Sequence, residues 1–298
     1  MKTALFLFNP HAGKGTIKAG LSKITDTLTR AGYLVTVYPT QSKGDACDKI
    51  LKWGLKYDRI VVAGGDGMLH EAFNAVMKLE RPVDLAYIPA GTANDFANSH
   101  KIPKAVDKAA AIAAGNQRRT IDVGTFNDEY FTYVAALGAI TDITYTTDQG
   151  AKNVFGYLAY LGTALKYINP QILLGSARKI EIKTDKKILT GEYLVCCVSN
   201  SLTIGSLKQF VPDDVITNDG LFEGLFIKKP KNLAQLSHTL DLVFSGNMDH
   251  PEIITLKSSR FEFTLDRGAN WTLDGEDGGT CDHAVIQNHR QALTMILP

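Results

Sequence analysis

The fold is decided by the stretch Val61-Val62-Ala63-Gly64-Gly65-Asp66-Gly67, where a short buried strand runs directly into a glycine-rich turn and then a helix. Glycines let backbone N–H groups approach phosphate oxygens closely, and a helix N-terminus adds partial positive charge. Asp66 stands where a carboxylate can hold Mg²⁺ against a nucleotide. The alternative is a tight strand-to-helix turn in which Asp66 only caps the helix.

Two further turns follow predicted strands. The stretch 89–95 reads Pro-Ala-Gly-Thr-Ala-Asn-Asp, and the stretch 9–15 reads Asn-Pro-His-Ala-Gly-Lys-Gly, without the spacing of a P-loop. Carboxyl ends of parallel strands share one sheet edge, so we expect the three turns to lie together and to bind an anionic ligand. Taken alone, residues 89–95 also fit an ordinary turn in which Asn94 and Asp95 cap a helix.

The N-terminal part of the chain alternates short apolar runs with helical periodicity, which predicts a parallel sheet covered by helices on both faces. The expected strands are Thr3–Phe8, Tyr33–Tyr38, Arg59–Ala63 and Leu85–Ile88. The expected helices are 16–31, Asp45–Leu55, Leu69–Leu79 and Val106–Ala114.

Short β-rich runs dominate the rest of the chain, which predicts a sandwich-like or barrel-like antiparallel domain. The runs are Tyr130–Ala136, Lys179–Lys183, Glu192–Val198, Leu221–Ile227, Glu252–Leu256, Arg260–Leu265 and Ala292–Leu297, with helices at Val154–Ile168 and Asn232–Phe244. We therefore expect an α/β domain over 1–122 and a β-rich domain over 123–287. The chain crosses near Ile121–Gly124, and a last strand near 288–298 can return to the first domain.

The composition of the chain argues against several classes of protein. The 298 residues carry a net charge of +1, so no bulk field attracts nucleic acid. The four cysteines show no CxxC spacing, which indicates buried thiols in a reducing cytoplasm rather than disulfides or a zinc site. The N-terminus does not fit a signal peptide, and no apolar run is long enough to span a bilayer. We expect a cytoplasmic protein.

An acidic turn lies far along the chain, at Asp274-Gly275-Glu276-Asp277. An ordinary hairpin turn is the alternative to a functional role. The functional interpretation is a general base that orients an acceptor hydroxyl and takes its proton late in phosphoryl transfer.

Together, Gly-Gly-Asp-Gly at 64–67, Pro-Ala-Gly-Thr-Ala-Asn-Asp-Phe-Ala at 89–97 and Asp-Gly-Glu at 274–276 resemble the diacylglycerol kinase catalytic-domain family, especially its small soluble bacterial lipid kinases. The resemblance covers nearly the whole chain in order. It implies an N-terminal nucleotide domain like that of NAD kinases and phosphofructokinases, a sandwich-like C-terminal domain and an active site in the cleft between them. The implied reaction moves the γ-phosphate of ATP to a lipid alcohol such as diacylglycerol.

The resemblance also implies site residues. The implied catalytic residues are Glu276, as proton acceptor, and Asp274. The ATP-site residues would be Asn9, Pro10, His11, Ala12, Gly13, Thr40, Gly64, Gly65, Asp66, Gly67, Met68, Leu69, His70, Glu71, Thr92, Asn94 and Asp95. A structural Mg²⁺ loop would use the Asp219 carboxylate and the carbonyls of Ile216 and Leu221. From its place in the helix, we interpret His70 as a surface residue.

One departure leaves an alternative open. Met68 stands where the family usually has Thr, so a hydroxyl is lost from the phosphate site. The alternatives are a weakly active or non-catalytic protein that binds nucleotide or lipid, and a kinase of a soluble substrate such as NAD.

The sequence indicates less about how the protein would contact its lipid. An apolar stripe on Val154–Ile168 fits core packing, or else a lipid-lined groove or interfacial helix. Lys228, Lys229 and Lys231 could touch anionic headgroups, although a solvated turn explains them as well. We expect transient peripheral contact with the inner face of the membrane, and a second copy of the chain as a further partner.

Overall fold

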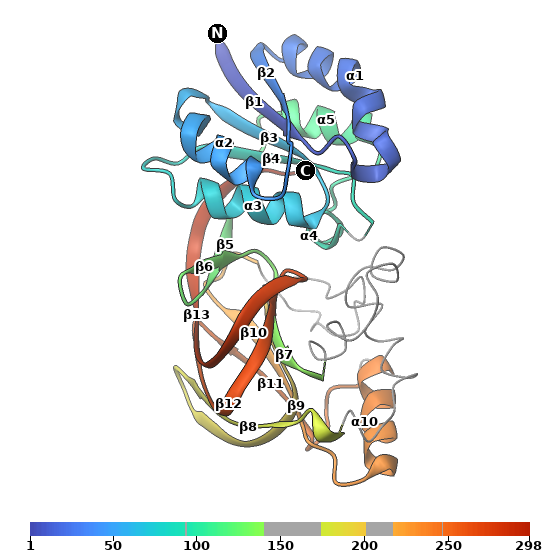
Figure 1. Ribbon diagram of the computed structural model, residues 1–298, viewed down its shortest axis with the longest axis vertical. Coiled ribbons are helices and arrows are strands. Elements are labelled where there is room, and N and C mark those ends of the chain that lie inside the picture. The colour runs from blue at the N-terminus through green and yellow to red at the C-terminus, as the bar shows by residue number, and fades with distance from the viewer. Residues whose placement is uncertain (93, 140–173, 201–216, 246) are drawn as a thin grey trace. The chain divides into compact units, whose positions relative to one another are not determined.

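The computed structural model describes residues 1–92, 94–139, 174–200, 217–245 and 247–298 (Figure 1). The chain divides into two compact units. The first contains Met1–Ile121 and Gln291–Pro298, and the second contains Asp122–Arg290.

The first unit is built on a parallel sheet. Strand β1 (Lys2–Phe8) lies between β2 (Tyr33–Pro39) and β3 (Arg59–Gly64), and β4 (Asp84–Pro89) pairs with β3. The end of β13 (Glu276–Ile296) adds to this sheet, with Met295 opposite Leu85 in parallel register. The chain end therefore returns to the sheet that the first ninety residues build.

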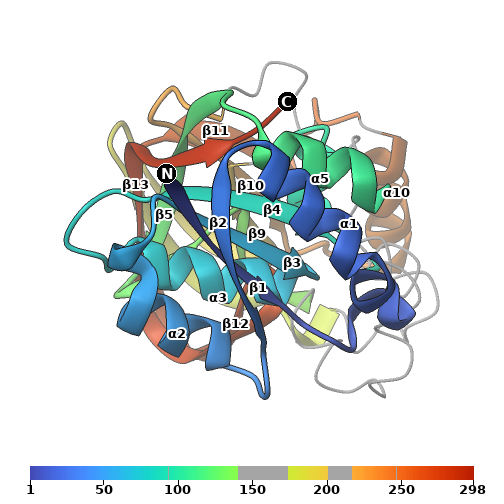
Figure 2. The same ribbon diagram turned by 90° about the horizontal axis from the view of Figure 1, so that it is seen from above.

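Helices cover both faces of this sheet, as parallel strands require. Helix α1 (Thr16–Arg30) packs with α5 (Val106–Ala114) on one face, and α2 (Asp45–Trp53) packs with α3 (Asp66–Val76) on the other (Figure 2). The short helix α4 (Asp95–Ser99) follows β4. All residues of β3 and β4 are buried, because each strand has a neighbouring strand on either side and helices cover both faces of the sheet.

The second unit is mostly antiparallel. Its strands are β6 (Glu129–Phe131), β7 (Val134–Gly138), β8 (Arg178–Thr184), β9 (Ile188–Ser199), β10 (Phe222–Lys228), β11 (Ile253–Ser258), β12 (Arg260–Leu273), most of β13 and the part of β5 (Arg118–Phe126) that follows Ile121. The pairings β7–β9, β9–β8, β8–β12 and β12–β7 form a closed circuit. Aromatic side chains such as Phe226, Phe263 and Trp271 fill one core of this unit.

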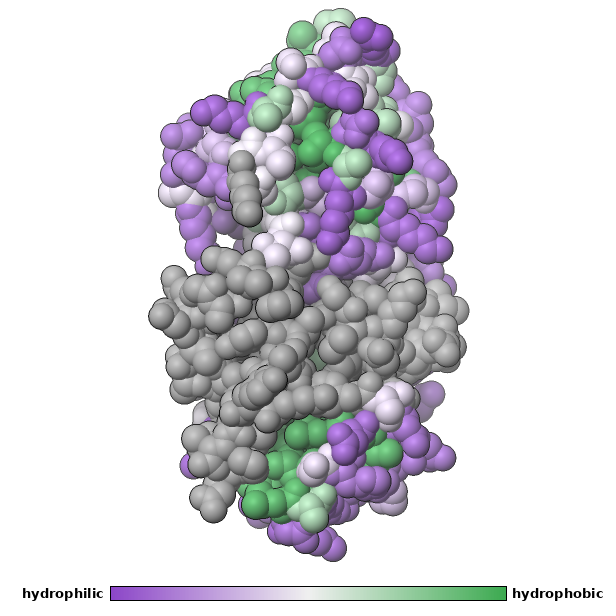
Figure 3. Space-filling view, turned by 90° about the vertical axis from the view of Figure 1, so that its right-hand side faces the viewer, coloured by the Kyte–Doolittle hydropathy of each residue, from purple (hydrophilic) through white to green (hydrophobic). Residues whose placement is uncertain are grey.

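A second core lies beneath helix α10 (Leu233–Ser245), where Leu236 and Val243 pack against Leu194, Val195 and neighbours of β7, β9 and β10. Apolar side chains also gather on the surface in the lower part of Figure 3, where Figure 1 places α10. In the part of the chain that the structure describes, no helix has the length and apolar character needed to cross a bilayer.

The structure confirms a mixed α/β fold with extensive sheet, and it corrects several local predictions. The division between the two units falls after Ile121, within the expected crossing segment Ile121–Gly124, and this segment is part of strand β5. The run Tyr130–Ala136 is two strands, β6 and β7, separated at Thr132 and Tyr133. The predicted helix Val154–Ile168 lies outside the described residues. Cys196 and Cys197 are buried free thiols, as predicted, whereas Cys47 and Cys281 are half-buried.

Candidate active site

Three turns meet at the carboxyl ends of β1, β3 and β4. The N–H of Asn9, after β1, donates to the carbonyl of Ala63 on β3 over 3.0 Å, and the N–H of Ala90, after β4, donates to the carbonyl of Gly64 over 2.7 Å. A Cβ added to Gly13 would lie 2.8 Å from the carbonyl oxygen of Ala90, so the first turn also touches the third. The structure thus brings together the three stretches that the sequence analysis expected at one sheet edge.

The turn after β3 places backbone N–H groups at the start of α3. Gly65 is the residue before the helix, and its carbonyl accepts the N–H of Leu69 over 3.2 Å. The N–H groups of the first helical turn have no partner within the helix, which makes this end a place for anions. Asp66, the first helical residue, accepts the N–H of Asn94 at Oδ2 over 2.8 Å. Its carboxylate therefore ties the two glycine turns together, and Gly65 rather than Asp66 holds the N-cap position of α3.

The turn after β4 is held by Asn94, which adopts a left-handed backbone with φ 53°. The Asn94 side chain accepts the N–H of Gly91 at Oδ1 over 2.9 Å and donates from Nδ2 to the carbonyl of Gly91 over 2.6 Å. Asn94 occupies the N-cap position of α4, as the turn interpretation expected, but its side chain makes no capping hydrogen bond. Asp95 is buried beside it, and Thr92 is exposed at the tip of the turn.

The backbones of the two glycine turns touch. A Cβ added to Gly91 would lie 2.6 Å from the Cα of Gly65 and 2.9 Å from Oδ1 of Asn94. A Cβ added to Gly64 would lie 2.7 Å from the Cβ of Met68. A side chain at Gly64 or Gly91 is therefore excluded, so an anion can approach the backbone N–H groups at the start of α3.

The first turn and the end of β2 complete the edge. Oδ1 of Asn9 accepts the N–H of His11 over 2.9 Å, and the carbonyl of Asn9 accepts the N–H of Ala12 over 3.2 Å. Thr40 follows β2 and donates its N–H to the carbonyl of Phe8 over 2.9 Å. Pro10 and Ala12 are half-buried and His11 is exposed. These residues occupy the same edge as Gly64 and Gly91.

The predicted residues on α3 divide between core and edge. Leu69 is 1% exposed and Met68 8% exposed, and both belong to the core. His70 is buried, and its ring lies 3.2 Å from Nδ2 of Asn74, so its interpretation as a surface residue is wrong. Glu71 accepts the N–H of Gly44 over 2.8 Å and so holds the loop that leads into α2.

In the second unit, Asp274 and Gly275 form the two-residue turn between β12 and β13, with φ values of 53° and 86°. Two positive φ values are the signature of a type I′ hairpin turn. The Asp274 carboxylate accepts four hydrogen bonds of 2.7–3.1 Å. The donors are Thr132 N, Thr132 Oγ1, Tyr133 N and Val134 N. Asp274 thus clamps the hairpin to the segment before β7.

Glu276 is the first residue of β13 and pairs with Leu273. Its carbonyl accepts the hydroxyl of Thr272 over 2.9 Å, and its side chain is half-buried. The turn therefore fixes the backbone from which the Glu276 carboxylate projects. The next acid, Asp277, is exposed and accepts the N–H of Gly279 over 2.8 Å.

The loop predicted to bind Mg²⁺ is partly described. Asp219 is half-buried and accepts the N–H of Leu221 at Oδ1 over 2.9 Å. Gly220, with φ 88°, donates its N–H over 2.7 Å to Oδ2 of the buried Asp122. Ile216 lies outside the described residues. Within the described part of the chain, no three His, Cys, Asp or Glu side chains cluster as metal ligands. Any ion here would depend on backbone carbonyls and the Asp219 carboxylate, oxygen donors that suit Mg²⁺.

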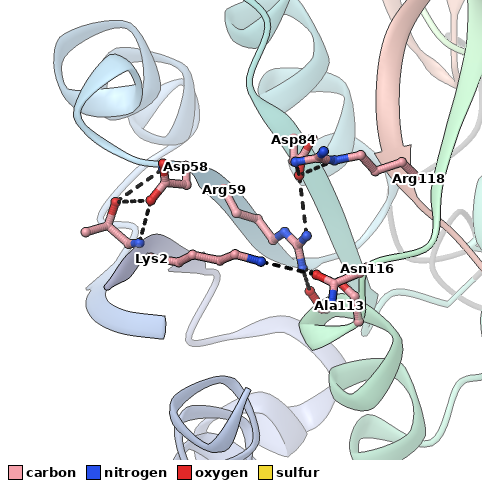
Figure 4. Close-up of polar contacts among 9 residues, drawn as sticks. Lys2, Asp58, Arg59, Asp84, Ala113, Asn116 and Arg118 are labelled. Atoms are coloured by element: carbon pink, nitrogen blue, oxygen red, sulfur yellow. Dashed lines mark hydrogen bonds and ion pairs between the residues drawn. The ribbon is translucent and has the colours of Figure 1, made fainter. Parts of the chain in front are cut away.

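A charged cluster marks the opposite edge of the parallel sheet (Figure 4). Arg59 and Asp84 are the first residues of β3 and β4, and their side chains lie 3.4 Å apart in the interior. Arg59 also donates to the carbonyls of Ala113 and Gly115, and Arg118 pairs with Asp84 over 2.8 Å. Asp84 is paired with both arginines, and the Arg59 guanidinium is bonded to carbonyls, so we interpret this edge as structural.

Comparison with known proteins agrees with the motifs. The protein-family model for the diacylglycerol kinase catalytic domain matches residues 3–126 of the chain. The chain is 31% identical to a diacylglycerol kinase of Bacillus subtilis (strain 168), over 100% of this chain and 97% of that protein. It is also 31% identical to a diacylglycerol kinase of Staphylococcus haemolyticus, over 93% of this chain and 83% of that protein.

A crystal structure of a protein of Bacillus anthracis str. Sterne, proposed to be a diacylglycerol kinase, superposes with a TM-score of 0.88 at 23% identity. The match covers 100% of this chain and 95% of that one. At this identity the likeness concerns the fold. The whole chain, and not only its first unit, shares that fold.

Proposed function

Because the chain belongs to the diacylglycerol kinase catalytic-domain family, we propose that it transfers the γ-phosphate of ATP to the hydroxyl of a membrane lipid alcohol such as diacylglycerol. The observation that carries this proposal is the contact of the turns after β1, β3 and β4, where side chains are excluded and backbone N–H groups remain. Such an edge suits a polyphosphate, whose charge the N-terminus of α3 also stabilises.

ATP would bind across this edge. The N–H groups of residues 64–67 would face its phosphates, with Asn9–Gly13, Thr40 and Thr92 around it. Asp66 and Glu71 already hold the backbones of Asn94 and Gly44 in place, so the phosphate turns need little reorganisation when the nucleotide binds. Mg²⁺ would neutralise the charge that builds up on the phosphates during transfer.

Glu276 would accept the proton of the lipid hydroxyl. Phosphoryl transfer depends mainly on positioning, so this carboxylate would chiefly orient the acceptor oxygen. Asp274 has a different role in this proposal. Its carboxylate is occupied by Thr132, Tyr133 and Val134, so it holds the hairpin from which Glu276 projects.

A structural Mg²⁺ would be held by the Asp219 carboxylate with the carbonyls of Leu221 and Ile216. Asp122 already fixes Gly220 in the left-handed conformation that this loop needs. The ion would stabilise the loop between the residues around Ile216 and β10. The protein would reach its lipid by transient contact with the inner face of the membrane.

The test is kinase activity in mixed micelles with labelled ATP, Mg²⁺ and diacylglycerol. We expect phosphorylated lipid from the native chain. Glu276→Gln should reduce kcat by roughly two to four orders of magnitude while nucleotide affinity stays within about twofold. Asp277→Asn, the exposed neighbour, is the matched control and should retain full activity. Equal activity of Glu276→Gln and Asp277→Asn would remove Glu276 from the mechanism.

Met68 motivates a second candidate, a weakly active protein that binds nucleotide or lipid. The side chain of Met68 lies against Gly64 at the phosphate turn, where the family pattern has a threonine hydroxyl. If the native enzyme is slow for this reason, Met68→Thr should raise kcat about tenfold or more, the effect of one hydrogen bond to a charged group. A fast native enzyme with no gain in Met68→Thr would eliminate this candidate.

The acceptor class needs its own comparison. NAD, sugar phosphates and diacylglycerol should be offered to the same preparation. Preferential phosphorylation of NAD or of a sugar phosphate would identify a kinase of soluble substrates and would contradict the lipid assignment.

A further inference from the structure

Tyr87, in the middle of β4, places a hydroxyl group between the two glycine turns. Its side chain is 1% exposed. The hydroxyl oxygen lies 3.0 Å from the carbonyl oxygen of Gly64 and 3.2 Å from Oδ1 of Asn94. The first acceptor belongs to the turn after β3 and the second to the turn after β4. One buried polar atom thus contacts both turns, and no motif in the sequence singles it out.

Both acceptors also receive a hydrogen bond from the turns themselves. The carbonyl of Gly64 accepts the N–H of Ala90 over 2.7 Å, and Oδ1 of Asn94 accepts the N–H of Gly91 over 2.9 Å. A phenol has a single proton, so Tyr87 shares its donor between two oxygens that are already engaged. Burial raises the pKa of Tyr87 well above its usual value, and the carboxylates of Asp66 and Asp95 raise it further, so the hydroxyl stays a donor.

The ring of Tyr87 is itself fixed by packing. It meets Phe96 of α4 edge-on, with ring centroids 6.5 Å apart, and Phe96 meets Phe73 of α3 edge-on at 5.5 Å. The ring therefore packs directly on α4, and α4 packs on α3 through Phe73. This packing holds the hydroxyl where it meets both turns.

We propose that Tyr87 is a positioning residue that fixes the spacing of the two glycine turns and thereby sets the affinity of the site for a nucleoside triphosphate. This role rests on the proposed ATP site. Loss of the hydroxyl leaves the turns tied by the Asp66 carboxylate and by the hydrogen bond from the N–H of Ala90 to the carbonyl of Gly64, so the site survives but with looser spacing. We expect no effect on the lipid side of the reaction, because the hydroxyl of Tyr87 bonds to the two nucleotide turns.

The test compares Tyr87→Phe with Tyr193→Phe in the full chain. Tyr193 is also a 1% exposed tyrosine in a strand, packed edge-on against Phe226 in the aromatic core of the second unit. For each protein, titration calorimetry with a non-hydrolysable ATP analogue gives Kd, and micelle kinetics give kcat and the KM values for ATP and lipid. Thermal unfolding measures the loss of stability that both variants share.

We expect Tyr87→Phe to raise Kd for the analogue and KM for ATP by roughly three- to tenfold, while KM for lipid and kcat stay within about twofold. Tyr193→Phe should lower the melting temperature without changing any nucleotide constant. Hydrogen exchange should show faster labelling of residues 64–67 and 90–95 in free Tyr87→Phe, and not in Tyr193→Phe.

The role is overturned if Kd of Tyr87→Phe stays within twofold of the native value, or if KM for lipid rises as much as KM for ATP. Asn94→Gly keeps the left-handed backbone but removes the shared acceptor, and it must show the same selective rise. If Tyr87→Phe fails to fold, unchanged nucleotide affinity in Asn94→Gly overturns the role instead. A native chain that binds no ATP would defeat the proposed function and this role with it, whereas tight binding by all variants defeats only the role of Tyr87.

Discussion

At the scale of single residues, the candidate site depends on glycines, which have no Cβ atom. Gly91 and Gly65 approach so closely that a Cβ on Gly91 would lie 2.6 Å from backbone. Steric exclusion of this kind keeps side chains away from the backbone of these turns, as the proposed phosphate site requires. Only glycine allows the backbones of the two turns to approach this closely, and the same glycines would let a phosphate approach the backbone. For this reason the two turns could be recognised from their glycines in the sequence.

Gly91→Ala should therefore cost about 1–3 kcal/mol of the free energy of unfolding, since backbone has to move, and should weaken ATP binding. Denaturant unfolding and calorimetry measure the two effects. Gly175→Ala is the matched control, because a Cβ at Gly175 meets nothing within 4 Å. Equal stability of the two variants would show that the turns are not in tight contact.

His100, at the end of α4, makes stability depend on pH. Its ring lies on Phe96, with centroids 4.3 Å apart, and burial, with a smaller effect of Arg119, lowers the pKa of His100 from 6.5 to about 4. The unfolded chain therefore binds a proton between these pH values that the folded chain does not. The stabilisation is complete above pH 6.5 and is lost as the pH falls toward 4.

We expect His100→Gln to reduce the loss of unfolding free energy between pH 7 and pH 5 by about 1–2 kcal/mol. Denaturant titrations at the two pH values measure this difference. His283→Gln, an exposed histidine on β13, serves as the control. Identical pH dependence of the native protein and His100→Gln would contradict the assignment.

At the scale of elements, the two edges of the parallel sheet carry different kinds of residue. The carboxyl ends of β1, β3 and β4 carry the glycine turns, and the amino ends of β3 and β4 carry Arg59 and Asp84. The Arg59 guanidinium also lies over the ring of Tyr33, 4.9 Å from its centroid. The charges of Arg59 and Asp84 at this second edge are paired and buried, whereas Arg118, which also pairs with Asp84, is exposed.

Asp84→Asn should lower the free energy of unfolding by about 2–4 kcal/mol, because it leaves the buried Arg59 without its carboxylate. Nucleotide affinity should be unchanged, since the change is at the far edge of the sheet. Asp107→Asn, which removes an exposed pair with Lys23, should cost less than about 1 kcal/mol. A loss in Asp84→Asn as small as that in Asp107→Asn would mean that the cluster is solvated.

Element boundaries show where local pattern is sufficient. Helix α5 begins at Val106 and ends at Ala114 as predicted, because an alanine-rich run is followed at once by Gly115. The strand predicted at Arg260–Leu265 instead continues to Leu273. Its pairing with β13 shifts register between Thr264 and Ala269, so polar residues that look like a loop lie in an irregular part of the hairpin.

At the scale of the whole molecule, the chain forms two units, and only the first contains the glycine turns. A ligand that binds the folded state alone stabilises it in proportion to its concentration over Kd. ATP at about 100 times Kd should add roughly 2.7 kcal/mol to the stability of the first unit.

Calorimetric unfolding with and without ATP tests this expectation. The transition that includes residues 1–121 should move to higher temperature. Gly91→Ala should show a smaller shift than Gly175→Ala at the same ATP concentration. A shift confined to residues 122–290 would place the nucleotide in the other unit and contradict the proposed site.

The sequence by itself determined the strands and helices of the first unit, the shared edge of its three turns and the family, because glycine, apolar periodicity and short acidic turns are local signals. Only the tertiary structure decided the contacts of Tyr87, His70 and Asp274. Whether a buried hydroxyl joins two turns, an imidazole enters the core or a carboxylate clamps a hairpin depends on partners up to 142 positions away. Such contacts arise from packing between elements, and no local pattern specifies them.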